Sequence, residues 1–225
     1  MPTLAIVGAG PGLGRSIARR FGSEGFRVAL LSRTQAKLDQ LAAELGADGI
    51  EAAGFAADVF DRASIAAALD AATERFGAID VLEYSPAPQA GATKLAPVPA
   101  PEVTVESIQP QIEFYVYGAV TAVQQVLPGM LERGSGTLLF TTGASSVLPF
   151  PPFGNIGIAG GALRDWVLNL HAALGERGIY AAHVPLATFI GSGGPETQPD
   201  TIAEVYWDLY TERDVPERLY STLEL

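Results

Sequence analysis

The sequence contains no cysteine among its 225 residues. It therefore has no disulfide, no thiolate nucleophile and no thiolate metal ligand, which fits a reducing, cytoplasmic location. Basic residues are also few, since 14 Lys and Arg face 25 Asp and Glu, and the net charge of −11 argues against nucleic acid as a partner. No apolar run approaches the roughly 20 residues of a membrane span, and the N-terminus lacks the basic start of a signal peptide. We expect an acidic, cytoplasmic protein with neither a membrane nor a nucleic acid as its partner.

Histidine is nearly absent as well. The two histidines, His171 and His183, are separated from each other and from any cluster with metal-ligand spacing. We therefore expect no metal site, and a hydrogen-bonded core or surface role for each histidine.

The residues that are present alternate between strand-like and helix-like segments joined by short turns. The expected strands are Thr3–Gly8, Arg27–Ser32, Ile50–Asp58, Ile79–Tyr84, Thr137–Thr142, Tyr180–Val184 and an edge strand at Leu219–Leu225. The expected helices are Gly12–Glu24, Thr34–Gly46, Asp61–Gly77, Thr104–Leu131, 155–174 and Thr201–Thr211. This alternation predicts an α/β fold, with a doubly wound parallel sheet of about seven strands and helices on both faces. The sheet order should reverse between the first and fourth strands.

Two stretches interrupt this rhythm. Residues 85–103 contain five prolines and predict an extended loop, and residues 185–213 predict a short segment on the substrate side. Within the long helix, Pro110 either introduces a kink or begins the main part of the helix. Neither stretch is long enough to separate two cores, so residues 1–225 are expected to form one domain.

A glycine-rich loop joins the first strand to the first helix. Gly8, Gly10, Gly12 and Gly14 surround Leu13 at this turn. Glycine lets the backbone approach a pyrophosphate closely, and the helix N-terminus presents free N–H groups to that anion. The strand before the loop and the helix after it favour a dinucleotide-binding loop, although the glycines could instead serve tight strand–helix packing alone.

The end of the second strand predicts which dinucleotide binds. An NAD site usually has an acidic residue here for the ribose diol, whereas this chain has Ser32, Arg33 and Thr34. These three side chains can donate hydrogen bonds to a 2′-phosphate, Arg33 with a positive charge. NADP(H) is therefore favoured over NAD(H); the alternative is that Arg33 is a solvated surface residue.

Taken together, these motifs resemble the short-chain dehydrogenase/reductase family over essentially the whole chain, and this resemblance implies a single-domain Rossmann fold. The matching positions are Gly8, Gly12 and Gly14 for the family's glycine pattern, Asp58-Val59 for its adenine contact, 79–87 with Tyr84 for its fourth strand and Asn-Asn-Ala-Gly motif, 136–146 for its fifth strand, and Ile190-Gly191-Ser192 for its nicotinamide contact. The resemblance implies that Asp58, Val59, Tyr84, Ile190 and Ser192 bind the cofactor. It also implies an oxidoreductase that acts on a small molecule.

The catalytic residues of that family are missing. The family uses an Asn, a Ser and a Tyr-x-x-x-Lys pair, and the corresponding positions are Tyr115, Gly143, Ile156 and Gly160. Misalignment does not explain the loss, because no Tyr lies between Tyr117 and Tyr180 and no Lys follows Lys94. An isoleucine side chain cannot transfer a proton.

Replacements for these residues are weak candidates. Tyr115 and Ser145 are the best of them, although Tyr115 fits aromatic packing better and Ser145 and its neighbour Ser146 fit a turn better. Two functions stay open. One is an NADP(H)-dependent oxidoreductase with an atypical proton source; the other is a non-catalytic relative that binds a dinucleotide or another ligand as a sensor or interaction partner.

The helix at 155–174 is rich in glycine and aliphatic residues near its start. Together with the helix at 104–131 it should form a subunit interface, because their apolar surfaces exceed what one sheet face can cover. Gly157, Gly160 and Gly161 would let two backbones approach closely there. We expect a homodimer or homotetramer.

Overall fold

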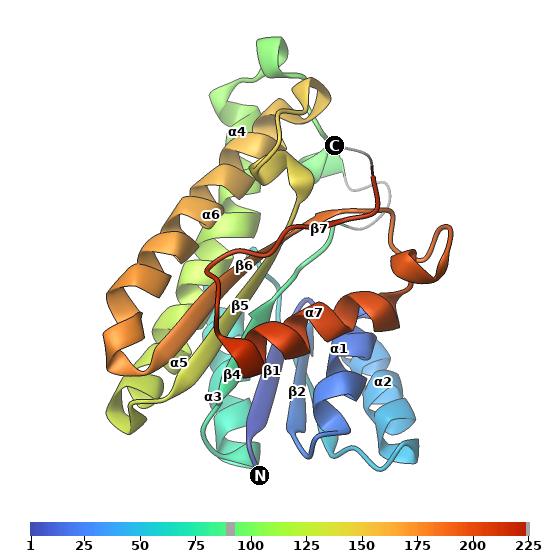
Figure 1. Ribbon diagram of the computed structural model, residues 1–225, viewed down its shortest axis with the longest axis vertical. Helices are drawn as coiled ribbons and strands as arrows, with labels where there is room; N and C mark the ends of the chain where they lie inside the picture. The colour runs from blue at the N-terminus through green and yellow to red at the C-terminus, as the bar shows by residue number, and fades with distance from the viewer. Residues whose placement is uncertain (89–92, 224–225) are drawn as a thin grey trace.

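The fold was obtained as a computed structural model that describes residues 1–88 and 93–223 (Figure 1). A seven-stranded parallel sheet has the order β3-β2-β1-β4-β5-β6-β7. Its strands are β1 Thr3–Val7, β2 Arg27–Ser32, β3 Ala52–Ala56, β4 Val81–Tyr84, β5 Gly136–Gly143, β6 Ile179–Ala187 and β7 Tyr220–Ser221. Every pairing is parallel, and β1 lies between β2 and β4. The predicted doubly wound sheet and its order reversal between the first and fourth strands are confirmed.

Helices cover both faces of the sheet (Figure 1). They are α1 Leu13–Gly22, α2 Gln35–Ala47, α3 Arg62–Phe76, α4 Val105–Ile112, α5 Gly118–Arg133, α6 Gly154–Leu174 and α7 Pro199–Glu212. One core packs α3, α5 and α6 against the sheet, and the other packs α1, α2 and α7 on the opposite face. Burial on both faces explains why β1 is an uninterrupted apolar run rather than an alternating one.

The long helix expected at 104–131 is not a uniform α-helix. A π-helical stretch, Glu113–Tyr117, separates α4 from α5. Pro110 lies inside α4, three residues before this stretch, and its missing N–H removes one bond of the helical ladder there. The segment therefore continues past Pro110 with altered winding rather than beginning at it.

Strand boundaries differ from the expected ones at both edges of the sheet. The third strand is shorter than expected, and the sixth continues to Ala187. The last strand is reduced to two residues that pair with the end of β6, while residues 224–225 of the expected strand lie outside the described residues. Residues 89–92 of the expected proline-rich loop also lie outside them; the rest of that loop contains two short 3-10 turns.

Asn155 fixes the start of α6 to the neighbouring loop, a role that the sequence did not suggest. Its buried amide oxygen accepts from the Val98 N–H at 2.9 Å, and its amide nitrogen donates to the carbonyls of Ala96 and Ser107. A buried amide with all its groups paired holds loop, α4 and α6 in one arrangement. Among the described residues, no helix is long and apolar enough to cross a membrane.

Candidate functional site

The glycine loop between β1 and α1 has the geometry of an anion cradle. Gly8 has a φ of +107°, and a Cβ there would lie 2.6 Å from the Pro86 nitrogen, so only glycine fits. Gly12 precedes the first turn of α1, and no side chain of the described residues caps this helix end. The first N–H groups and the positive end of the helix dipole are therefore available to a phosphate.

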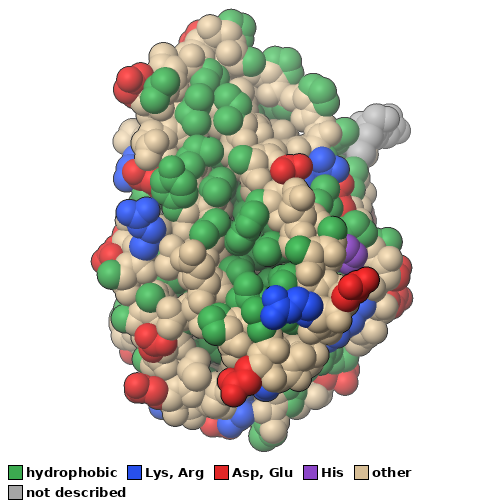
Figure 2. Space-filling model, turned by 90° about the vertical axis from the view of Figure 1, so that its left-hand side faces the viewer, with side chains coloured by type: hydrophobic (Ala, Val, Ile, Leu, Met, Phe, Trp, Pro, Cys, Tyr) green, Lys and Arg blue, Asp and Glu red, His purple; other side chains and the backbone are tan. Residues whose placement is uncertain are grey.

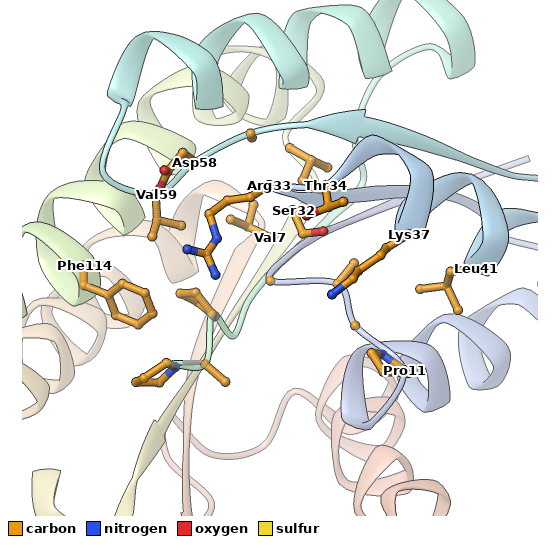
Figure 3. A pocket seen from close by; sticks show the side chains of 18 of the residues that line it. Val7, Pro11, Ser32, Arg33, Thr34, Lys37, Leu41, Asp58, Val59 and Phe114 are labelled. Carbon is orange, nitrogen blue, oxygen red and sulfur yellow. The ribbon is translucent and has the colours of Figure 1, made fainter. Parts of the chain in front are cut away.

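A cavity of about 710 Å³ opens beside this loop, at the carboxyl ends of the strands (Figure 3). Of the residues predicted to bind a cofactor, seven line it: Gly8, Gly10, Ser32, Arg33, Thr34, Asp58 and Val59. The apolar part of the wall includes Val7, Leu41 and Phe114. This volume and the mixed lining suit part of a dinucleotide.

Basic side chains dominate the charge of this cavity near the end of β2. Arg33 reaches into the hollow, and Lys37 extends over it from the first turn of α2 (Figure 3). Both are exposed, and neither forms an ion pair within the described residues. Sequence reasoning missed Lys37, although its place three residues after Thr34, on the first turn of a helix, was a usable signal.

A second lysine lies on the far wall. Lys94 has its ammonium nitrogen 3.7 Å from the centre of the Phe60 ring and 3.5 Å from a carboxylate oxygen of Glu113. It follows residues 89–92, and no motif predicted it. Its charge is shared between an aromatic face and a carboxylate, so Arg33 and Lys37 remain the cations that face the cavity without a carboxylate partner among the described residues.

The remaining predicted cofactor residues lie elsewhere. Gly12, Leu13 and Gly14 form the start of α1, outside the lining of this cavity. Ile190 is exposed on the loop after β6, and the Ser192 hydroxyl donates to the Phe189 carbonyl at 2.8 Å. The structure therefore brings together the loop, the end of β2 and the turn after β3 at one cavity, while Ile190 and Ser192 do not line it and stay predicted cofactor residues.

Tyr84 requires a correction. Its side chain is 0% exposed, and its hydroxyl donates to the Phe114 carbonyl at 2.6 Å, within the π-helical stretch. Burial raises its pKa far above the ordinary value. The phenol therefore belongs to the core and is not part of the lining of the cavity.

The four positions of the missing catalytic residues are now visible in space. Tyr115 is 8% exposed, and burial raises its pKa to about 12, which is unsuited to proton transfer near neutral pH. Ile156 packs against the core. Gly143 is exposed, and a Cβ there would meet no heavy atom within 4 Å, so the place of a serine side chain is open space.

The glycines of α6 are explained by the turn that follows β5. A Cβ on Gly160 would lie 3.1 Å from the Ser146 Cβ, and one on Gly157 would lie 3.2 Å from the Ser145 carbonyl oxygen. The backbone that approaches these glycines is therefore the chain's own turn at Ala144–Ser146. Within one chain this turn accounts for Gly157 and Gly160, and the expected close approach of a second subunit at Gly157, Gly160 and Gly161 stays a prediction.

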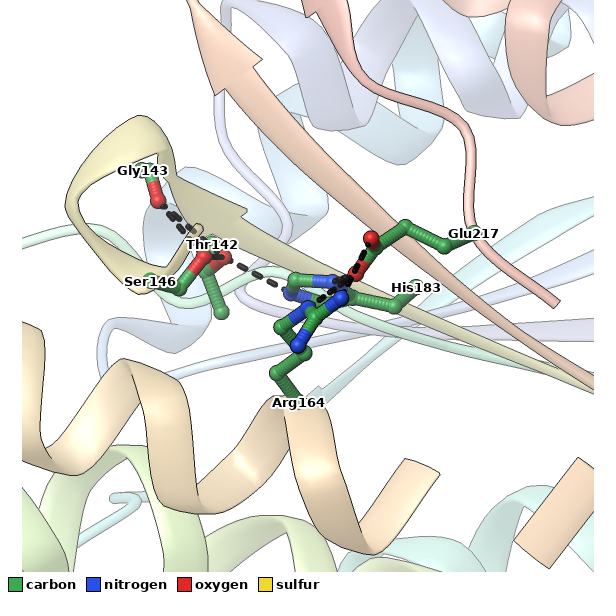
Figure 4. Close-up of polar contacts among 6 residues, drawn as sticks. All are labelled: Thr142, Gly143, Ser146, Arg164, His183 and Glu217. Carbon is green, nitrogen blue, oxygen red and sulfur yellow. Dashed lines mark hydrogen bonds and ion pairs between the residues drawn. The ribbon is translucent and has the colours of Figure 1, made fainter. Parts of the chain in front are cut away.

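Polar side chains form a connected row behind this turn (Figure 4). Thr142 contacts both the Ser146 hydroxyl, at 2.7 Å, and His183 Nε2, at 2.8 Å. His183 Nδ1 lies 2.9 Å from Glu217, which Arg164 binds through two nitrogens. His183 thus has the hydrogen-bonded core role expected of it, and no hydrogen bond joins the Ser145 hydroxyl to this row among the described residues.

The comparisons with known proteins agree with this architecture. Residues 2–189 match the family model described as short chain dehydrogenase. The chain is 31% identical over 169 residues to D-threitol dehydrogenase of Mycolicibacterium smegmatis, a match that covers 72% of this chain and 63% of that enzyme. It is 27% identical to sulfoacetaldehyde reductase 2 of Chromohalobacter salexigens, over 98% of this chain and 87% of that enzyme.

Solved structures show the same fold. An actinorhodin polyketide ketoreductase variant crystallised with NADPH superposes with a TM-score of 0.85 at 23% identity, over 98% of this chain and 96% of that one. A short-chain dehydrogenase from Rhodopseudomonas palustris gives a TM-score of 0.84 at 24% identity and covers 99% of both chains.

Proposed function

The chain belongs to the short-chain dehydrogenase family, and from this premise we propose that it binds NADP(H) in the cavity beside the glycine loop. The observation that carries this proposal is the pair of exposed cations, Arg33 and Lys37, at the end of β2 where an NAD site would have an acid. The 2′-phosphate would bind between these two side chains, with Ser32 and Thr34 as further donors.

The phosphates that link the two nucleotides would lie on the glycine loop. Gly8 leaves room that any side chain would fill, and the uncapped start of α1 supplies N–H donors. When bound, the nicotinamide would supply a hydride or accept one. A polyketide ketoreductase with NADPH and a reductase of Brucella melitensis with bound NAD both share this fold, so the proposed preference for NADP(H) depends on Arg33 and Lys37 rather than on the fold.

Titration of the protein with NADPH and NADH, followed by fluorescence or calorimetry, tests this proposal. We expect NADPH to bind at least tenfold more tightly, which corresponds to about 1.4 kcal/mol. Equal affinities would refute the assignment of Arg33, and failure of both to bind would refute the cofactor site as a whole.

The reaction we propose is that of an oxidoreductase on a small molecule, with slow turnover of ordinary alcohols and ketones. Gly143, Ile156 and Gly160 supply none of the acid–base or orienting groups that contribute roughly 10²–10⁴-fold to such reactions. The same three positions favour the second candidate, a non-catalytic member that binds a dinucleotide as a sensor or interaction partner. A panel of carbonyl compounds and alcohols separates the two, because a sensor binds the cofactor and turns over none of them.

We also infer that the α5–α6 face is where two copies of the chain associate as a homodimer or homotetramer. A band of hydrophobic side chains runs over this face (Figure 2), and it includes the exposed Ile158 and Tyr117. Apolar surface of this kind is usually covered by a partner.

Light scattering of the wild type and of Ile158→Glu tests the association. We expect the wild type to exceed the mass of one chain, 23.5 kDa, and the variant to approach it at micromolar concentration. Leu219→Glu, on the segment leading to β7, is the control and should keep the wild-type mass. A wild type that is monomeric at this concentration would contradict the inference.

A further inference from the structure

The row of polar side chains at Ser146, Thr142, His183 and Glu217 has a defined direction. Arg164 binds the Glu217 carboxylate and holds its pKa below the usual range, so this carboxylate is ionised and can only accept. His183 Nδ1 must therefore carry a proton and donate to it, at 2.9 Å. This leaves Nε2 of the neutral imidazole as an acceptor.

The remaining protons of the row follow from this assignment. Thr142 has one hydroxyl proton, which it donates to His183 Nε2 at 2.8 Å. The contact of 2.7 Å between the two hydroxyl oxygens then requires the proton of Ser146, directed at Thr142 Oγ1. The Gly143 carbonyl, 2.9 Å from Ser146 Oγ, is the other acceptor in reach of that proton. The hydrogen bonds thus run from Ser146 through Thr142 to His183.

The two ends of the row lie in different surroundings. His183 is 0% exposed and Thr142 is 5% exposed, whereas Ser146 is half-buried on the turn after β5. Ser146 lies near two of the positions at which the family's catalytic side chains are missing, because its hydroxyl is 2.9 Å from the Gly143 carbonyl oxygen and a Cβ on Gly160 would lie 3.1 Å from its Cβ. A Cβ on Gly143 would meet no heavy atom within 4 Å, so the place of the missing serine side chain is open.

We propose that Ser146 is the catalytic residue that takes the proton of an alcohol substrate, and that Thr142 and His183 are positioning residues that carry this proton into the protein. The proposal rests on the proposed NADP(H)-dependent function. The substrate carbon loses a hydride to oxidised NADP⁺, and its hydroxyl proton passes to Ser146 Oγ. Ser146 gives its own proton to Thr142, Thr142 gives its proton to His183 Nε2, and the resulting imidazolium is stabilised by Glu217. The alcohol is oxidised by two electrons to a carbonyl, and NADP⁺ is reduced by the same two.

The charges around His183 decide whether these side chains assist alcohol oxidation or ketone reduction. From the segment after α7 it faces Glu217, from α6 it faces Arg164 behind that carboxylate, and from β5 it meets only the neutral Thr142. Burial lowers the pKa of His183 from its ordinary 6.5, so the imidazole is neutral at pH 7 and is ready to accept a proton. Alcohol oxidation is served at neutral pH, while reduction of a ketone would need the imidazolium, which forms only at lower pH.

Alcohol oxidation assayed with NADP⁺ over a panel of secondary alcohols provides the kinetic test. We expect kcat to fall at acidic pH, where His183 becomes protonated, and to level off toward neutral pH, because burial holds the pKa of His183 below its ordinary 6.5. Ser146→Ala and Thr142→Val should each lower kcat by about 10²-fold with a small change in KM, and Thr142→Ser should restore most of it. Ser145→Ala is the matched control, because it removes a hydroxyl one residue away that has no hydrogen bond to the row among the described residues.

Nitrogen-15 NMR of the histidine rings gives a readout that needs no turnover. The proposal expects a neutral His183 with the proton on Nδ1 at pH 7, and a changed Nε2 resonance in Thr142→Val but not in Ser145→Ala. A proton on Nε2 would reverse the direction of the hydrogen bonds between His183, Thr142 and Ser146, and would overturn the proposal. So would equal effects of Ser145→Ala and Ser146→Ala, or a panel in which no alcohol reduces NADP⁺ faster than in the absence of protein.

NADPH titration of each variant keeps this proposal separate from the proposed function. If the wild type does not bind NADPH, the proposed function has failed. If the wild type and Ser146→Ala bind NADPH equally, while oxidation keeps its rate and its pH profile in the variant, only the role of Ser146 has failed.

Discussion

The two halves of the sheet differ in how they depend on side chains. In the half from β1 to β4, the cavity is lined by the glycine loop, by the ends of β2 and β3 and by the side chains of Arg33 and Lys37, with the uncapped start of α1 nearby. In the half from β5 to α6, the positions that would carry chemistry have an open space at Gly143, an apolar side chain at Ile156 and a packed glycine at Gly160. Binding of a pyrophosphate depends largely on backbone geometry, whereas proton transfer depends on individual side chains. The proposed retention of cofactor binding therefore rests largely on the glycine loop, and the proposed loss of the usual proton transfer rests on Gly143, Ile156 and Gly160.

Restoring the missing side chains of the β5–α6 half should give the largest change, an increase in the rate of ketone reduction. Ile156→Tyr alone should change ketone reduction by less than about threefold, because without a lysine the pKa of the phenol stays at about 10, which leaves it a weak proton donor. Gly143→Ser, Ile156→Tyr and Gly160→Lys together should raise it by about 10²-fold. The lysine Cβ would meet the Ser146 Cβ at 3.1 Å, so Ser146→Gly belongs in the same variant.

The assay is NADPH oxidation by each variant with a ketone panel, and NADPH binding is measured in parallel to exclude misfolding. A wild-type turnover near the typical enzyme scale of roughly 10 s⁻¹ would remove the contrast between the halves, since the β5–α6 half would then already be competent.

A smaller effect is expected on the nucleotide side. Arg33→Asp should weaken NADPH binding by tenfold or more, about 1.4 kcal/mol, and leave NADH binding nearly unchanged, because only NADPH has the 2′-phosphate. Arg177→Asp makes the same change of charge on the exposed turn before β6, at the opposite end of the sheet. Both variants are compared by calorimetric titration, and equal losses in the two would indicate a general effect of charge rather than a phosphate contact.

The boundary between the halves contains a buried carboxyl group whose effect should be smaller again. Glu83 on β4 accepts from the hydroxyls of Ser85 and Thr141, and burial raises its pKa to about 8. Its folded pKa exceeds the unfolded one, so its contribution is full below pH 4.5 and is lost as pH rises toward 8. Glu83→Gln, which stays neutral, should gain about 1 kcal/mol or more in free energy of unfolding relative to wild type at pH 8 and little near pH 4.

Urea unfolding at the two pH values measures this difference, and Glu132→Gln, an exposed residue near the end of α5, is the control. A Glu83→Gln variant that follows the wild-type pH dependence would show that this carboxyl is ionised in the fold.

Two neighbouring glycines of α6 give the smallest and most local comparison. Gly161→Ala places its Cβ 4.0 Å from the Ser146 carbonyl oxygen, an ordinary van der Waals distance, and should stabilise the helix by up to about 1 kcal/mol. Gly160→Ala must displace Ser146 by a few tenths of an ångström, so it should gain less or lose stability. Thermal unfolding of both variants is the measurement. Equal gains in stability would mean that Ser146 moves aside with no measurable loss of stability.

Most of the fold could be predicted from the sequence, because a fully buried parallel strand and an amphipathic helix each have a recognisable pattern. Asp61 was expected to cap α3, and its carboxylate accepts from two N–H groups there. The π-helical stretch could not be predicted, since no local pattern marks it, and the Tyr84 hydroxyl that binds its Phe114 carbonyl lies 30 positions away in the sequence. The strand β7 has only two residues because it pairs with β6 only at Leu186 and Ala187, and a pairing between distant segments is not visible in the local sequence.

The candidate site divides in the same way. Arg33 and the glycine loop follow local motifs, and the structure places them at one cavity. Thr142, His183 and Glu217 carry no local signal, because they come from three separate segments that only the sheet brings together. Tyr84 misled the interpretation for the same reason: its position in a motif was correct, while its burial depended on the helix packed above it.

The packing of α7 on α1 has a consequence for how the chain folds as it is made. Arg20 binds Glu204, and Ser16 binds Asp200, across 184 positions of sequence. The apolar face that α1 and β1 share with α7 therefore stays uncovered until the last segment has left the ribosome. Contacts of such long range slow the final step of folding. During synthesis, the nucleotide-binding half is the one that stands exposed to aggregation and to chaperones, although it is the first half to be made.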